Sequence, residues 1–176
     1  MLAVEGRKTE PQYFQMLGSV VAAVHIKIIK PGASSPAAVP GSMQEYLARA
    51  DLRRGDEAWI VVDKDQWADD QIDQLQQWAA QSNERGLAVS NPKFEYWLLL
   101  HFEDGTGVAS SSECSKRLRR HLPGYDKGVE CSKFRPDAIA GAVARARARD
   151  RRPAGGWPRE PGQSTVYRLV ERILGS

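Results

Sequence analysis

Short apolar segments alternate with amphipathic ones along the first hundred residues of the chain. The continuous apolar segments are typical of buried strands, and they cover residues 2–5, 24–29, 58–62 and 87–89. Helical spacing of apolar residues between them predicts helices that begin at Thr9 and cover residues 43–52 and 69–85. Because the strands are apolar on both faces, the pattern favours an α/β fold with a mainly parallel sheet flanked by helices.

The remainder of the chain has mostly helical patterns. The apolar segment KFEYWLLLHF predicts a buried helix, with Asn91 as its cap and Pro92 at its first position. Further helices are predicted at residues 112–121, 137–152 and 164–174. The composition of residues 31–41 predicts a loop, and the Pro/Gly-rich linker at residues 151–162 is expected to be exposed. We therefore expect a core over residues 1–110 and a helical C-terminal extension over residues 111–176 that packs on it.

The composition, with 41% hydrophobic and 27% charged residues, is that of a soluble globular protein. No apolar run approaches the roughly 20 residues that a membrane-spanning helix needs. The first ten residues, MLAVEGRKTE, lack the basic and apolar regions of a signal peptide. The two cysteines, Cys114 and Cys131, do not make a disulfide framework, and together with His121 they fit no common zinc spacing. We therefore expect a cytoplasmic protein.

The net charge of +3 conceals two segments of opposite sign. Residues 63–73 carry five aspartates against a single lysine, and residues 133–159 carry eight lysines and arginines against two aspartates. A protein that handles a phosphate backbone through a metal needs both signs of charge. The alternative is that both segments are solvated surface. In the predicted helix over residues 137–152, Arg145, Arg149 and Arg152 share one face, which suits a nucleic acid backbone or an acidic partner.

Carboxylates stand where two predicted strands end. Glu5 ends the first strand, and Asp63 ends the third, with Asp65 two residues later. Ligand sites of open α/β sheets lie beyond the carboxyl ends of the strands, so these side chains are expected to converge, and converging carboxylates need a cation. Mg²⁺, or Mn²⁺ in its place, is the candidate because Mg²⁺ takes hard oxygen ligands and binds through a few carboxylates plus substrate phosphate. The alternative is ordinary turn and capping chemistry.

Other candidate residues lie close to these strand ends. Glu95 falls in the first turn of the predicted buried helix, where the helix terminus favours its ionised form. It either serves the metal, as a further ligand or as an orienter of the metal's water, or it is the partner of a nearby lysine or arginine. Arg7 or Lys8 is placed to contact a phosphate or to face solvent. Gly6 lacks a Cβ and leaves room for a phosphate near the backbone, whereas His101 is expected to be structural.

Three blocks of sequence resemble the RloB family, namely VEGRKTEPQYF (4–14), VVDKDQW (61–67) and SNPKFEYWLLLHF (90–102). The third block is the most distinctive, and the tail QSTVYRLVERIL (163–174) resembles the C-terminal helix of that family. The resemblance implies a TOPRIM-like fold, with Glu5 as the TOPRIM glutamate and Asp63 and Asp65 as its Asp-x-Asp pair. It also implies a place in abortive-infection or restriction loci of bacterial anti-phage defence, beside an AAA-type ATPase partner.

Three functions follow as hypotheses. The first is a Mg²⁺-dependent nuclease acting on DNA or RNA, with a metal on Glu5, Asp63 and Asp65. Glu95 would join these three residues in catalysis. The nucleic acid backbone would be positioned by Lys8, Arg145, Arg149 and Arg152. The second is a non-catalytic or partner-activated subunit of an ATPase-containing abortive-infection complex. The third is nucleotide or phosphoryl transfer at the same site, because fold does not determine function.

Overall fold

The centre of the protein is a mostly parallel sheet in a computed structural model that describes residues 1–21, 24–30, 38–150 and 156–175. Its strands in the described residues are β1 (Leu2–Val4), β2 (Ile28–Ile29), β3 (Ala58–Asp63), β4 (Arg85–Asn91) and β5 (Gln163–Ser164). Their order across the sheet is β2-β1-β3-β4-β5. The first four strands run parallel, and β5 pairs antiparallel with β4. The mainly parallel sheet expected from the sequence is therefore confirmed.

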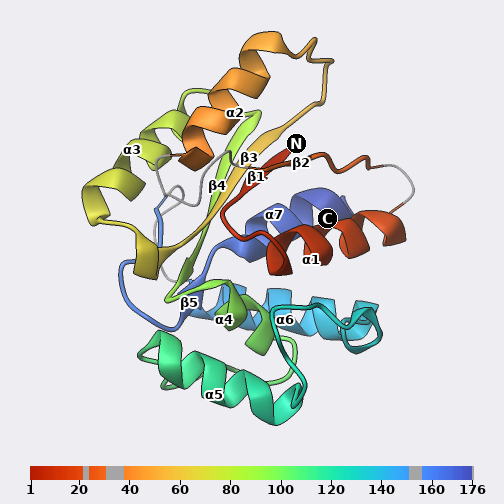
Figure 1. The fold of residues 1–176 in the computed structure, drawn as a ribbon, viewed down its shortest axis with the longest axis vertical. Coiled ribbons are helices and arrows are strands. Elements are labelled where there is room, and N and C mark those ends of the chain that lie inside the picture. Colours follow the sequence, from red (N-terminus) through yellow and green to blue (C-terminus); the bar gives the residue numbers. More distant parts are fainter. Residues whose placement is uncertain (22–23, 31–37, 151–155, 176) are drawn as a thin grey trace.

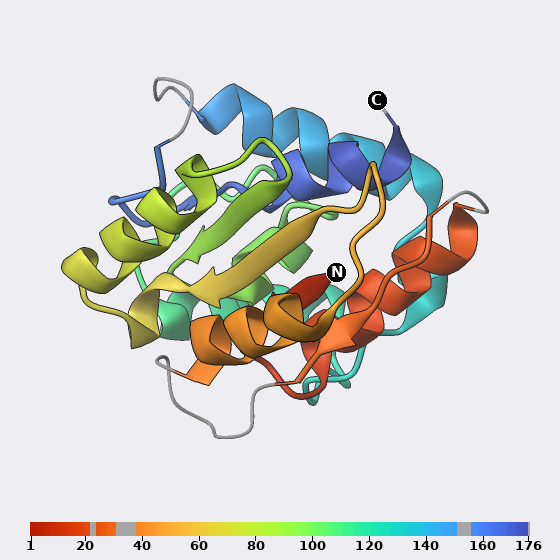
Figure 2. The ribbon, with the colours of Figure 1, turned by 90° about the horizontal axis from the view of Figure 1, so that it is seen from above.

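Helices cover both faces of this sheet (Figures 1 and 2). They are α1 (Thr9–Val20), α2 (Ala38–Arg49), α3 (Asp69–Ala80), α4 (Phe94–Leu99), α5 (Ser111–His121), α6 (Pro136–Arg149) and α7 (Val166–Leu174). Two short 3₁₀ turns, η1 (Lys64–Gln66) and η2 (Cys131–Lys133), complete the regular structure of the described residues. Among these helices, none combines the length and the apolar character needed to cross a membrane.

Alternation along the strands divides the apolar residues between two cores. Ile60 and Val62 of β3 face α2 and α3, and they pack in one core with residues such as Met43 and Ile72. Val61 faces the opposite way, into a larger core that α1 and α4 to α7 share. This is why β1 and β3 up to Val62 are apolar at consecutive positions. The larger core contains residues from both sides of position 110.

Some element boundaries differ from the sequence prediction. The helix predicted over residues 69–85 ends at Ala80, and Gly86 lies within β4 instead of ending a helix. A Cβ on Gly86 would lie 2.3 Å from the Trp59 ring, so glycine lets that ring cross the strand. Residues 38–41 belong to the first turn of α2, where a proline is tolerated, so the predicted loop there was wrong. The rest of that prediction, residues 31–37, lies outside the described residues.

Of the exposed linker predicted over residues 151–162, residues 151–155 lie outside the described residues. The rest belongs to the segment Gly156–Ser164, which we call the strap, and only residues 159–161 of it are exposed. Trp157 is only 4% exposed and packs in the core beneath α2 and α3. Its indole N–H donates to Asp73 Oδ1 of α3 at 2.7 Å. Asn91 was wrongly predicted as a helix cap, because it lies in β4 and its amide donates to the carbonyls of Pro158 and Arg159. Composition predicted the absence of a helix correctly but carried no information on burial.

Replacement of Trp157 by alanine should destabilise the protein by about 3–5 kcal/mol, because it removes a buried aromatic side chain and leaves a cavity. Trp157→Phe keeps most of the buried area and loses the hydrogen bond to Asp73, so it should cost about 1 kcal/mol. Urea unfolding followed by circular dichroism measures both values. Leu52→Ala, at a site that is 47% exposed, is the control and should change little. Equal effects of Trp157→Ala and Leu52→Ala would contradict the burial of the strap.

Candidate metal centre

A cavity of about 510 Å³ lies at the carboxyl ends of β1 and β3, and we call it the strand-end pocket. Both signs of charge line it. Its acidic lining residues are Glu5, Glu10, Asp63, Asp65 and Glu95, and its basic ones are Arg7, Lys8, Lys93 and Lys127. The structure therefore brings together Glu5, Asp63, Asp65, Glu95 and Lys8, which the sequence had singled out. The location is the one expected for a ligand site in an open parallel sheet.

Parallel pairing of β1 with β3 places Glu5 beside Asp63. Val4 is in register with Val61, so the two strands reach the same edge of the sheet. Glu5 follows β1 directly, and its Oε2 accepts hydrogen bonds from Asp63 N at 3.2 Å and from Trp67 Nε1 at 2.9 Å. Burial raises the pKa of Glu5, while the Trp67 hydrogen bond acts in the opposite direction. The indole therefore fixes one carboxylate oxygen of Glu5 at the pocket wall.

Asp63 is held among several other carboxylates of the pocket. Its Oδ1 accepts a 2.7 Å hydrogen bond from the backbone N–H of Phe94, at the start of α4. Burial raises the pKa of Asp63 well above its ordinary range. Repulsion from neighbouring carboxylates, first Glu10 and Glu5 and then Glu95, raises it further. This concentration of negative charge is the condition under which carboxylates bind a cation.

Glu10 belongs to this acidic group, although the sequence analysis did not identify it. It is 5% exposed, and its Oε1 accepts a 3.0 Å hydrogen bond from Gly6 N. An acidic residue in the first turn of a helix is common for reasons of the helix dipole alone, so its sequence position carried no special signal. A Cβ at Gly6 would lie 1.9 Å from Glu10 Oε2. The space beside Gly6 therefore holds the Glu10 carboxylate, and it is not open to a phosphate as expected.

Glu95 is held by residues from beyond α5. Its side chain is 5% exposed, and its Oε1 lies 3.8 Å from the ammonium of Lys127, whose own side chain is 70% exposed. The hydroxyl of Tyr125 donates to the same oxygen at 3.1 Å. Thr9 Oγ1 donates to the Lys127 carbonyl at 2.9 Å, which ties this loop to the start of α1. Of the two sequence hypotheses for Glu95, its pairing with a cation is observed, and its role as a metal ligand stays a prediction.

Asp65 sits on η1, which two separate contacts hold in place. The backbone N–H of Asp65 donates to the Pro92 carbonyl at 3.0 Å. Its Oδ2 accepts a hydrogen bond from Ser111 Oγ, at the first residue of α5. Its Oδ1 accepts one from Gln66 Nε2 at 3.2 Å. The first turn of α5 therefore forms part of the wall around Asp65.

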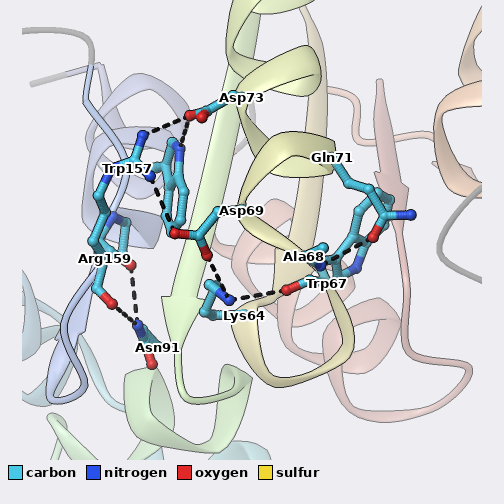
Figure 3. A network of polar contacts seen from close by, with 10 residues as sticks. Lys64, Trp67, Ala68, Asp69, Gln71, Asp73, Asn91, Trp157 and Arg159 are labelled. Atoms are coloured by element: carbon cyan, nitrogen blue, oxygen red, sulfur yellow. Dashed lines mark hydrogen bonds and ion pairs between the residues drawn. The ribbon is translucent and has the colours of Figure 1, made fainter.

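The strap also supports η1, through a separate network of polar contacts (Figure 3). Lys64 Nζ lies 3.1 Å from Asp69 Oδ1 and donates to the Trp67 carbonyl at 2.9 Å. Arg159 pairs with Asp69 at 3.2 Å and with Asp73 at 2.8 Å. Its guanidinium also lies over the Trp157 ring, 4.4 Å from the centroid. This network joins the strap, η1 and α3, so Lys64 serves the fold and does not line the pocket.

The acidic side chains of the pocket are of the kind that coordinates Mg²⁺. Every acidic donor is a carboxylate oxygen, the ligand that Mg²⁺ prefers, and the repulsion that raises the pKa of Asp63 is what a cation relieves. Across the described residues, however, no three histidine, cysteine, aspartate or glutamate side chains stand close enough to share one metal ion. The carboxylates instead accept hydrogen bonds from the protein. Binding a metal requires some of them to exchange these bonds for metal coordination.

The arginines of α6 that the sequence singled out lie outside the strand-end pocket. Arg145 Nη1 donates to the Leu100 carbonyl at 2.7 Å. Arg149 Nε donates to the Gly162 carbonyl at 3.0 Å. Both side chains therefore hold backbone segments of the fold, and their binding of nucleic acid stays a prediction. Arg152 lies outside the described residues.

Glu10→Gln should stabilise the metal-free chain at neutral and alkaline pH. Burial, with repulsion from Glu95 and Glu5, raises the pKa of Glu10 from 4.5 to about 7. The folded chain therefore binds this proton more tightly than the unfolded chain does. The resulting stability is fully present below pH 4.5 and is lost as the pH rises to about 7. Urea unfolding in EDTA should show a free energy that falls over this range, with a smaller fall in Glu10→Gln.

The control for this experiment is Glu45→Gln, which neutralises an exposed glutamate of α2. It removes the same charge from a solvated site and should leave the pH dependence of the parent chain unchanged. A Glu10→Gln protein with the same pH slope as Glu45→Gln would show that the Glu10 carboxylate ionises normally.

Similarity to known proteins extends over nearly the entire chain. A family model described as "RloB-like protein" matches residues 1–173. It confirms the resemblance carried by the three sequence blocks and the tail. No curated protein and no solved structure shows a match to the chain. The chain therefore belongs to the RloB-like family.

Proposed function

We propose that the chain is a Mg²⁺- or Mn²⁺-dependent nuclease with a TOPRIM-like fold that acts in bacterial anti-phage defence. The observation that carries the nuclease proposal is the meeting of Glu5, Asp63, Asp65 and Glu95 with basic residues in one pocket at the strand ends. Acidic residues suit a divalent cation, and basic residues suit the phosphates of its substrate. The TOPRIM-like fold, the defence role and a cytoplasmic location rest on the resemblance and composition described above.

Glu5, Asp63 and Asp65 would hold the metal in this proposal. A bound divalent cation would polarise a phosphoryl oxygen and lower the pKa of a coordinated water. The protein fixes one oxygen of Glu5 through Trp67 Nε1 and one oxygen of Asp63 through Phe94 N. These two hydrogen bonds leave the second oxygen of each carboxylate available for coordination.

Lys127 is the basic residue best placed to receive the phosphate. Its ammonium is paired with Glu95, and most of its side chain is exposed at the pocket. Its exposed ammonium can therefore turn toward a substrate phosphate, and a cation bound in the pocket would then compensate the buried charge of Glu95. Lys8, which directly precedes α1, is held against the loop that carries Lys127, because its Nζ donates to the Asp126 carbonyl at 3.0 Å.

A second candidate function is a subunit that becomes active only with a partner, for which the family resemblance suggests an AAA-type ATPase. The observation that favours it is the internal satisfaction of the acids. Glu5, Asp63 and Asp65 all accept hydrogen bonds from the protein, and no three such side chains in the described ranges are gathered for one metal. In this case the partner would rearrange the pocket before a metal could bind.

Titration calorimetry with Mg²⁺ and with Mn²⁺ tests the metal site. The parent chain should bind the metal, and the double variant Asp63→Asn, Asp65→Asn should lose this binding while keeping similar side-chain shapes. The same substitutions should lower cleavage of plasmid DNA, single-stranded DNA or tRNA by about 100-fold or more, since a catalytic metal supplies several kcal/mol of transition-state stabilisation. Asp51→Asn, at an exposed aspartate outside the pocket, is the control and should bind and cleave normally.

The two candidate functions give different results in this experiment. A folded parent chain that binds neither metal would contradict the proposal for the isolated chain and favour the partner-activated subunit. Metal binding that survives the double substitution would place the metal away from the strand ends.

A further inference from the structure

The first half of α5 contacts two residues that line the strand-end pocket, Asp65 and Lys93. This helix lies beside α4, at the end of the sheet toward which β4 runs (Figure 1). Ser111 Oγ donates to Asp65 Oδ2, and Lys93 Nζ donates to Ser115 Oγ at 2.7 Å. Ser111 and Ser115 are four residues apart, so they lie on the same side of the helix. This side of α5 therefore packs against two residues of the pocket lining.

Cations continue along α5 from this point. Arg119 follows Ser115 by four residues and so lies near the same side of the helix. Lys116 is turned about 100° from Ser115 toward solvent, and about 60° from Arg119. Both side chains are exposed, and among the described residues no hydrogen bond or ion pair engages either of them. With a rise of about 1.5 Å per residue, Ser111 and Arg119 are about 12 Å apart along the helix. Glu113, the one acid of α5, lies on the opposite side from Ser111.

The cations of α6 are arranged differently. Arg145 and Arg149 donate to backbone carbonyls, and Arg147 pairs with Glu171. These guanidinium groups already have partners within the protein. Lys116 and Arg119 are therefore better candidates for contacting an external anion.

We propose that the phosphate backbone of a nucleic acid substrate passes from the strand-end pocket along Lys93, Lys116 and Arg119, which we call the α5 track. The inference rests on the proposed function and specifies how its substrate is held. The spacing suits a polyanion, because Lys116 and Arg119 are about 4.5 Å apart along the helix and successive phosphates of one strand are about 3.4 Å apart along a duplex. Contacts to phosphates carry no sequence information, and binding along the track is accordingly independent of base sequence.

Fluorescence anisotropy with labelled single-stranded DNA, duplex DNA and RNA oligonucleotides tests the track, in EDTA and at several salt concentrations. The variant Lys116→Ala, Arg119→Ala should bind at least about tenfold more weakly at low salt, for whichever of the three the parent binds best. The slope of log K against log salt should fall by about 1.4 to 1.8, because each lost phosphate contact removes about 0.7–0.9.

Two matched controls separate the track from general charge. Arg53→Ala, Arg54→Ala removes the same charge at the opposite end of β3, from two other exposed arginines, and should bind like the parent. Arg49→Ala removes an exposed arginine from the last turn of α2, which packs in the core on the other face of the sheet from α5, so it should weaken binding less than Arg119→Ala. Thermal melting of every variant confirms that it is folded.

Equal losses in the α5 and Arg53, Arg54 double variants would overturn the proposal, and so would a parent chain that binds none of the three nucleic acids. Because the binding measurement needs neither metal nor cleavage, its outcome is separate from that of the nuclease proposal. A chain that binds along α5 and never cleaves would refute the nuclease proposal alone. A chain that cleaves but whose binding does not depend on α5 would refute the track alone.

Discussion

The concentration of carboxylates at the ends of β1 and β3 is the constraint on which the rest of the structure depends. Parallel pairing brings Glu5 and Asp63 to one edge of the sheet, and burial makes their negative charges costly. The fold offsets this cost with hydrogen-bond donors that it aims at the acids. Trp67 supplies its indole N–H to Glu5, and α4 presents the N–H of Phe94 to Asp63 at its positive end.

The same constraint draws distant parts of the chain around the pocket. Glu95 is paired with Lys127 and accepts a hydrogen bond from Tyr125, and Asp65 accepts one from Ser111. These partners all come from beyond residue 110, so the segment that sequence patterns assigned to an extension completes the walls of the pocket. Between them the two parts of the chain supply the acidic and basic residues of the pocket, the combination that the proposed metal-dependent phosphodiester chemistry would use.

The surrounding charges divide into those that hold the fold and those that face outward. Arg159 in the strap and Arg145 in α6 pair with groups inside the protein, and the strap network in turn steadies η1, which carries Asp65 (Figure 3). Arg119 and Lys116 of α5 are exposed beside the pocket instead. Exposed cations next to a partly buried acidic site are suited to steering a polyanion toward it. The pocket and the α5 track are in this sense parts of one proposed binding surface.

The sequence by itself located the four parallel strands and the acids at the ends of β1 and β3, although β2 is shorter than predicted and the antiparallel β5 was not foreseen. A buried parallel strand must be apolar on both faces, so β3 was visible as a continuous apolar run, and Asp63 stood out because it ends that run. Local patterns also located the later helices to within a few residues. The end of α3 was predicted less accurately, because Gly86 was taken as the residue that stops the helix. Gly86 lies in β4 instead, where it accommodates the Trp59 ring.

Only the tertiary structure decided which distant residues join the site. Glu10 looked like any first-turn acid, and its burial comes from its neighbours in the fold. Lys127 and Trp157 stood in segments with no regular pattern. Each is placed by a contact with a residue far away in sequence, Glu95 for Lys127 and Asp73 for Trp157. Periodicity reports which side of a helix or strand is apolar. It carries no information on which segments pack together, and the charge balance of the pocket depends on that packing.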